Sequence, residues 1–232
     1  MIRKIFKRMR LSWVLIFILV GVLWNTPVVY PLKILVVFLH ELSHGIAALA
    51  TGGRIEEIVV VPQEGGHTLT IGGSRFWTLS AGYLGSLVWG GLILVIAART
   101  HLDKLLSVAI GSGMILVSIV YGGNWFIRLF GIAFGGGLIL VGGLLSESIN
   151  DWVLRVIGFT SCLYAILDIK SDVLDRSGAR SDARMLHEEL TPMIPTVAWG
   201  ILWIIIAIIG TIFFLYVSGG NQASPKDDEI NG

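Results

Sequence analysis

The stretch FLHELSHG, residues 38–45, lies within an apolar segment long enough to cross a bilayer. His40 and His44 are four residues apart, so on a helix both imidazoles project from one face and can bind a single Zn²⁺. Glu41 falls within about a quarter turn of that face, close enough to take a proton from a metal-bound water. Because each of these side chains is costly in hydrocarbon without a partner or a function, the stretch predicts a metal site within the membrane.

The composition is that of a membrane protein. A mean hydropathy of +0.80, with 54% hydrophobic and only 14% charged residues, excludes an ordinary soluble domain of 232 residues. The net charge of +1 and the absence of a basic patch beyond the membrane flanks give no indication of nucleic-acid binding. The single cysteine, Cys162, excludes an internal disulfide and a cysteine-rich zinc finger.

The hydropathy pattern predicts an all-α polytopic membrane protein with about seven transmembrane helices. A β-hairpin at 55–71 is expected between the second and third, because β-branched and alternating residues flank a Pro-Gln-Glu-Gly-Gly turn. We expect one membrane-embedded domain over 1–217, with a polar loop at 170–193 and a disordered polar tail at 218–232. The expected spans are about 12–30, 31–51, 76–98, 104–121, 128–145, 151–169 and 194–217.

The basic residues predict an orientation. With a cytosolic N-terminus, twelve of the seventeen lysines and arginines fall on the inner side, which favours a cytosolic N-terminus and an outside C-terminus. The hairpin and the 170–193 loop then lie on the cytosolic side of a multi-pass protein of the cell membrane.

A catalytic zinc needs a third protein ligand, and few intramembrane residues are available. Asp168 and Asp172 share a helix face at the end of the sixth span, and Asp168 is expected at a depth similar to that of His44. Asp168 is therefore the expected third ligand. Asp172 is expected to orient a ligand or to pair with Arg176. Asp172 and the hairpin residue His67 are also alternative candidates for a metal ligand.

Several motifs together resemble the site-2 protease class of intramembrane zinc metalloproteases, in its short bacterial and plant-type branch. The resemblance covers about residues 34–216, although the Asn-Pro-x-x-Leu-Asp-Gly stretch of well-known members is missing and Ile169 follows Asp168. The matching stretches are HELSHGIAALATGGRI, the Gly-Gly-His-Thr turn, SAGYLGS at 80–86, AILDIKSDVL and SDARML…TPMIPTVAWGILW.

The resemblance implies a metalloendopeptidase that cuts peptide bonds in or near the membrane. His40 and His44 would bind zinc, Glu41 would be the general base, and an aspartate on a later helix would complete the site. The expected partners are the lipid bilayer and a transmembrane or membrane-proximal peptide substrate. In SAGYLGS, small residues and hydroxyls are candidates for helix packing or for a substrate or water route: Ser80, Gly82, Tyr83 and Gly85.

Two other classes of function fit the same residues. The first is a catalytically inactive membrane relative with a structural or regulatory zinc site. A structural site would need a fourth protein ligand in the position that a catalytic site leaves open for water. The second is a transporter with a polar cluster among glycine-rich spans, which the absence of an internal repeat disfavours. Metal-dependent cleavage would distinguish the protease from both.

Overall fold

The computed structural model describes residues 11–175 and 181–219. Within these residues, six helical segments are long and apolar enough to cross a membrane, and one two-stranded antiparallel hairpin follows the first of them. The predicted all-α polytopic fold with a hairpin insertion is confirmed. The six are α3 (Tyr30–Ala50), α4 (Arg75–Arg99), α5 (Asp103–Tyr121), α6 (Trp125–Leu144), α7 (Glu147–Lys170) with its extension to Val173, and α9 (Thr196–Ser218).

The first expected span, about 12–30, is not one continuous helix in the described part of the chain. Its helix, α2 (Leu11–Val22), has twelve residues, about 18 Å at 1.5 Å per residue, against roughly 30 Å of hydrocarbon. Residues Leu23 to Val29 form turns, because the sequence Asn25-Thr26-Pro27 disfavours a continued helix. The described residues therefore contain six candidate spans in place of about seven. The expected disordered tail falls mostly on residues 220–232, outside the described part.

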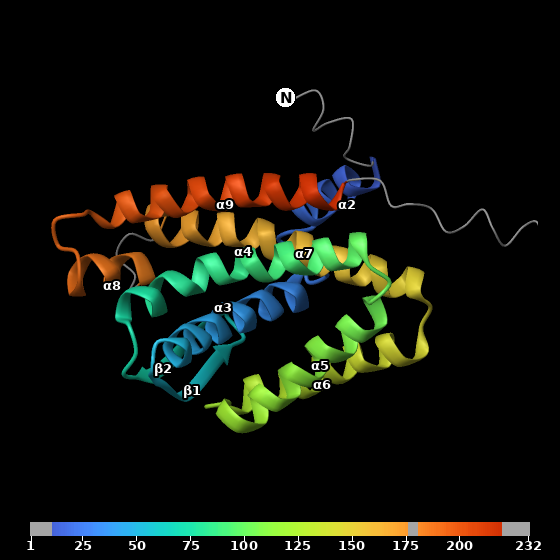
Figure 1. Cartoon of the computed structure of the whole chain (residues 1–232), viewed down its shortest axis with the longest axis horizontal. Helices are drawn as coiled ribbons and strands as arrows, with labels where there is room; N and C mark the ends of the chain where they lie inside the picture. The colour runs from blue at the N-terminus through green and yellow to red at the C-terminus, as the bar shows by residue number, and fades with distance from the viewer. Residues whose placement is uncertain (1–10, 176–180, 220–232) are drawn as a thin grey trace, which may run out of the picture.

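Helix α4 occupies the centre of the molecule and packs against α3, α7 and α9 (Figure 1). Helices α5 and α6 form a separate pair, which contacts the rest mainly through α7 and the hairpin (Figure 1). Pro31 occupies the first turn of α3, where its missing N–H costs no hydrogen bond. The helix ends before Gly52, whose φ of +87° suits glycine.

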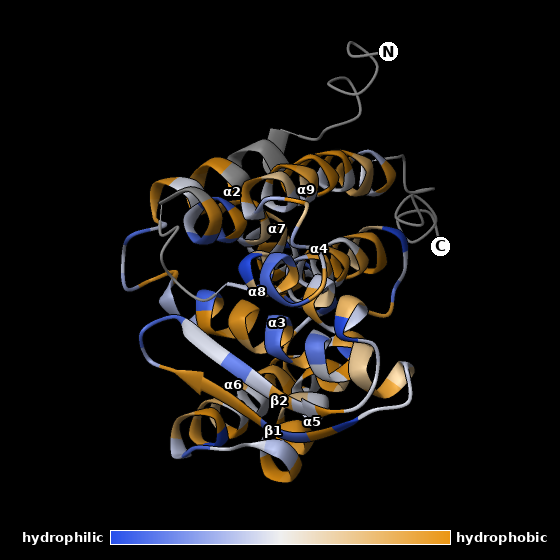
Figure 2. Ribbon diagram, turned by 90° about the vertical axis from the view of Figure 1, so that its left-hand side faces the viewer, coloured by the Kyte–Doolittle hydropathy of each residue, from blue (hydrophilic) through white to orange (hydrophobic). Residues whose placement is uncertain are grey.

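The hairpin consists of β1 (Arg54–Val61) and β2 (Gly65–Ile71) and lies flat along α3, between that helix and the α5–α6 pair (Figure 2). Its turn reaches the opposite end of α3, where the hydroxyl of Tyr30 donates to the carbonyl of Pro62 at 2.9 Å. Lys33, in the first turn of α3, is buried and forms an ion pair with Glu64 at 3.1 Å. The hairpin therefore extends along most of the metal-motif helix.

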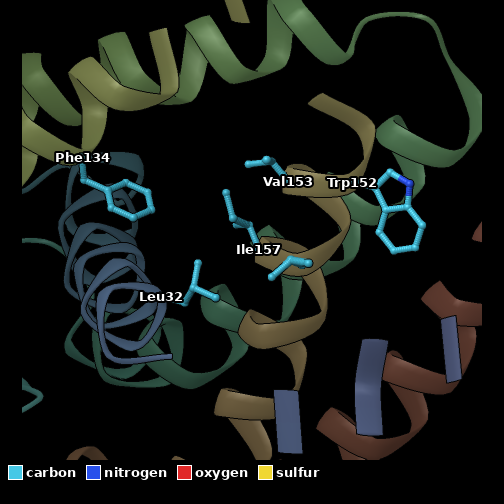
Figure 3. Close-up of a pocket in the computed structure, with 6 residues that line it drawn as sticks. Leu32, Phe134, Trp152, Val153 and Ile157 are labelled. Carbon is cyan, nitrogen blue, oxygen red and sulfur yellow. The ribbon is translucent and has the colours of Figure 1, made fainter. Parts of the chain in front are cut away.

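One cavity of about 290 Å³ lies between α3, α6 and α7, and its lining is entirely apolar (Figure 3). It contains none of the candidate site residues. The lining residues are Leu32, Phe134, Trp152, Val153, Val156 and Ile157.

Helix α7 continues into a π-helical turn, η1 (Ser171–Asp175), and a short helix, α8 (Asp182–Glu189), follows. α8 packs on α4 and α9, and Arg75 at the start of α4 binds Glu189 at 2.7 Å. These contacts hold α8 in place, and it lies close to α3 (Figure 2).

Candidate metal centre

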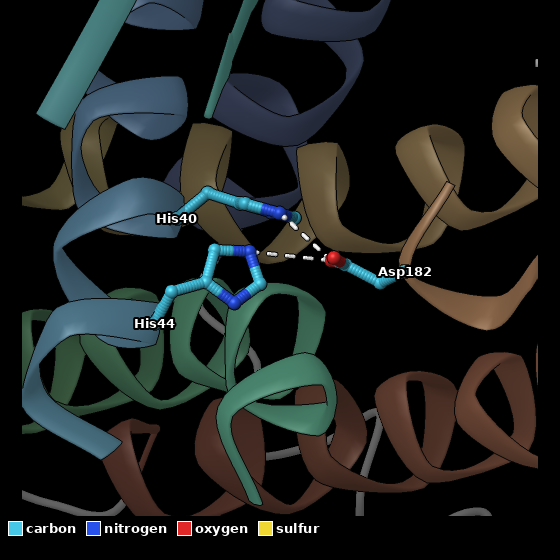
Figure 4. Close-up of side chains that lie close together, drawn as sticks. All are labelled: His40, His44 and Asp182. Carbon is cyan, nitrogen blue, oxygen red and sulfur yellow. Dashed lines mark hydrogen bonds and ion pairs between the residues drawn. The ribbon is translucent and has the colours of Figure 1, made fainter. Parts of the chain in front are cut away.

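The two motif histidines meet a carboxylate that comes from a distant part of the chain. The Nε2 atoms of His40 and His44 lie 3.2 and 3.3 Å from the same oxygen, Oδ2 of Asp182 (Figure 4). His44 and Asp182 are buried, and His40 is partly buried. One ligand atom from each of the three lies within 4.8 Å of the other two. The structure thus assembles a His-His-Asp group.

Asp182 is the first residue of α8. Ser181 precedes it as the N-cap and accepts a hydrogen bond from the backbone N–H of Arg184, which fixes the start of the helix. Although burial by itself would raise the pKa of the Asp182 carboxyl, the imidazoles of His44 and His40 lower it below its usual range. An ionised carboxylate is the form that binds a metal.

The other ring nitrogen of each histidine also has a partner. Nδ1 of His44 lies 2.7 Å from the backbone carbonyl of Thr78, and Nδ1 of His40 lies 3.7 Å from Oδ2 of Asp168. Such contacts orient ligating imidazoles and select the nitrogen that faces the metal. Asp168 therefore lies on the side of His40 that faces away from Asp182.

Asp172 is tied to the site through Tyr83. The hydroxyl of Tyr83 donates to Oδ2 of Asp172 at 2.8 Å, and the ring of Tyr83 meets that of His40 edge-on at a centroid distance of 5.1 Å. The expected pairing of Asp172 with Arg176 involves a residue outside the described ranges. Asp172 thus reaches His40 through the tyrosine.

Glu41 is held by the hairpin. Thr68 of β2 lies 2.9 Å from the Glu41 carboxylate and 2.8 Å from its backbone carbonyl. Gly66 allows this approach, since a Cβ there would lie 2.8 Å from Cγ and 2.9 Å from Oε1 of Glu41. The Gly-Gly-His-Thr motif is therefore the sequence that brings β2 against the candidate base.

The SAGYLGS motif explains the close packing of α4 on α3. A Cβ on Gly82 would lie 2.3 Å from Nε2 of His40 and 2.6 Å from Nε2 of His44, so only glycine leaves that space open. A Cβ on Gly85 would meet the Ser43 side chain at 2.1 Å. Gly82 thus lines the space in front of the histidines, and Gly85 belongs to the helix interface.

Two other candidate residues stay outside the group. His67 is exposed and lies on the strand face opposite to Thr68, so the structure does not bring it to the histidines. Ser80 is buried, and its hydroxyl has no hydrogen-bond partner among the described residues.

Sequence reasoning did not find Asp182. Its position in a polar segment gave no indication of depth, although the residue belongs to the family-typical SDARML stretch. The contact with His40 spans 142 positions of sequence, and no helical or strand periodicity reaches that far.

The group fits a zinc ion by its donor set. Two imidazole nitrogens and one carboxylate are the ligand types of catalytic zinc sites, and ligands at 2.0–2.2 Å from one tetrahedral ion have donor atoms roughly 3–4 Å apart. The separations of 3.2 and 3.3 Å lie in that range. Gly82 keeps free the space into which both Nε2 atoms point.

Comparison with known proteins identifies a family. No curated protein and no solved structure shows significant similarity to the chain. The family model described as Peptidase M50B-like matches residues 13–214, most of the sequence, including all three members of the His-His-Asp group. The match confirms the resemblance to the site-2 protease class, and the chain belongs to the Peptidase M50B-like family.

Proposed function

We propose that the protein is an intramembrane zinc metalloprotease, with His40, His44 and Asp182 as metal ligands and Glu41 as general base. The observation that supports the proposal best is the convergence of two Nε2 atoms and one carboxylate oxygen inside a membrane domain of a peptidase family. In this assignment Asp168 orients His40 through Nδ1, which differs from the ligand role expected from the sequence.

The roles of the residues follow from their chemistry. Bound zinc supplies a Lewis acid that polarises the scissile carbonyl and lowers the pKa of a water to about 7. Glu41 takes a proton from the attacking water and returns it to the leaving amine. Its carboxylate is buried in the membrane domain, where it stays close to the ligands because it lies on the same helix.

Chelation should abolish activity reversibly. We expect the purified protein in detergent to cleave a transmembrane model peptide, to lose cleavage with a chelator and to regain it with zinc. The measurement pairs product analysis by mass spectrometry with metal content. Zinc bound without cleavage of any peptide in a diverse transmembrane set would favour a structural metal site, and cleavage unaffected by metal removal would contradict the proposal.

The hairpin offers one edge to an unwound substrate. The outer edge of β1 is covered, because the backbone N–H of Gly123 donates to the Ile58 carbonyl at 2.8 Å and Asn124 donates to the Val60 carbonyl at 2.9 Å. In the described part of the chain, no hydrogen bond reaches the outer edge of β2. A peptide that has lost its helical hydrogen bonds can pair with such an edge.

Backbone methylation of the substrate tests strand addition. Only alternate residues of an added strand point their N–H toward the edge, so N-methylation should raise KM at alternate positions near the cleavage site. The measurement is a scan of singly methylated model peptides that the protein cleaves. Equal effects at neighbouring positions would mean that the substrate does not pair with β2.

The membrane orientation follows from the connections between the six spans. Six crossings put Tyr30 and Ser218 on one face, and put the two ends of the hairpin, Arg54 and Ile71, on the other face together with α8. The face with the hairpin ends carries more basic residues, which supports a cytosolic location for this face, the orientation expected from the sequence. The described basic residues on the face with the hairpin ends are Arg54, Arg75, Arg128, Lys170 and Arg184, and those on the other side are Lys33, Arg99, Lys104 and Arg155.

Cysteine labelling checks this orientation. In a Cys162→Ser background, Glu188→Cys should react only from the cytosol and His101→Cys only from outside. Both target residues are exposed. The reverse labelling pattern would mean that the orientation in the membrane is the opposite of the proposed one. A cytosolic N-terminus with an outside C-terminus requires α2 to cross as well, so epitope tags found on the same side would exclude that crossing.

A further inference from the structure

We propose that Thr68 is a positioning residue that holds the Glu41 carboxylate in its working orientation and thereby connects the hairpin to catalysis. The proposal rests on the proposed function of Glu41 as general base, and it assigns a role to the threonine of the Gly-Gly-His-Thr motif. The Thr68 hydroxyl lies 2.9 Å from Oε2 of Glu41 and 2.8 Å from its backbone carbonyl, so its single proton is shared between these two oxygens.

The hairpin geometry presents this hydroxyl to α3. Thr68 pairs with Ile58, which is fully buried, so both side chains point to the face of the hairpin that packs on α3. Two glycines let the elements approach: a Cβ on Gly66 would contact Glu41, and Gly45 of α3 lies against Ile55 of β1. The hydroxyl is therefore fixed by packing along the length of both elements.

The far end of the hairpin is also fixed. Lys33 binds Glu64 at 3.1 Å and lies 4.9 Å from the ring centroid of Trp24. The ion pair is partly shielded from water, since the Lys33 side chain is buried and that of Glu64 is 35% exposed. The turn that precedes β2 is thus held against α3, which supports the position of Thr68 beside Glu41.

The backbone N–H and C=O of Thr68 point away from β1. The Ile58 carbonyl accepts from Gly123 on the outer side of β1, so Ile58 and Thr68 form a pair without mutual hydrogen bonds. The N–H and C=O of Thr68 therefore lie on the open edge of β2. One residue orients the base with its side chain and offers its backbone to the substrate.

Three threonine variants separate orientation from packing. A hydrogen bond to a charged group is worth about 1.5–3 kcal/mol, so Thr68→Val should lower kcat about 10- to 100-fold. Its zinc content and KM should stay near wild type, because no metal ligand and no backbone group changes. Thr68→Ser should restore most of kcat. Thr70→Val is the matched control, since Thr70 lies on the same face of β2 and its side chain shows no hydrogen bond within the described residues.

A spectroscopic measurement makes the test independent of turnover. The infrared carboxyl band that is missing in Glu41→Gln should shift in Thr68→Val and return in Thr68→Ser. An unshifted band, loss of zinc in Thr68→Val, or an equal loss of kcat in Thr70→Val would overturn the proposal. If the wild type cleaves no peptide, the proposed function fails, while the infrared result still decides whether Thr68 holds Glu41.

Discussion

Asp182→Ala is expected to remove zinc from the purified protein, with a loss of affinity above about 100-fold, because it deletes one of three protein ligands. Asp168→Asn should cost about 10- to 100-fold or less, as is typical of a residue that orients a ligand. The difference follows from position: Asp182 lies 3.2–3.3 Å from both Nε2 atoms, whereas Asp168 lies 3.7 Å from Nδ1 of His40.

Competition with a chromophoric chelator measures these affinities. Asp172→Asn serves as a control, since its contact with the site runs through Tyr83, and its metal should be largely retained. His40→Ala and His44→Ala give the loss of zinc affinity expected when one ligand is removed. Zinc lost in Asp168→Asn but retained in Asp182→Ala would restore Asp168 as the third ligand, as the sequence alone suggested.

Glu41→Gln is expected to keep zinc and to lose about 10²- to 10⁴-fold in kcat, because a general base contributes that much to a proton-transfer step. Glutamine matches the size of glutamate and still accepts a hydrogen bond from Thr68, so the fold and the ligands should not change. The measurement is kcat on a cleaved model peptide, together with metal content.

Glu56→Gln is the matched control for this variant. Glu56 is an exposed residue of β1 that pairs with Arg54 at 2.6 Å, and exposed ion pairs contribute little to stability. Its replacement should leave kcat near wild type. Full activity of Glu41→Gln would show that Glu41 is not the base, and loss of zinc would show that it supports the ligands.

The sequence by itself determined the parts of this protein that depend on local spacing. The four-residue interval placed His40 and His44 on one face of α3, since side chains at i and i+4 of a helix are neighbours. Apolar runs of about 20 residues predicted the long helices, and alternating β-branched residues predicted the hairpin. Each of these patterns lies within one element, where backbone geometry alone relates the residues.

Only the tertiary structure decided which distant residues join the motif. The choice between Asp168 and Asp182 depends on how α7, η1 and α8 turn back toward α3, and spacing along the chain does not encode that path. The same holds for Thr68 and Gly82, whose roles come from the packing of β2 and α4 on α3. α2 shows a further limit of hydropathy, because an apolar run of sufficient length was divided by Asn25-Thr26-Pro27. Contacts between elements depend on complementary packing over whole surfaces, which no local pattern contains.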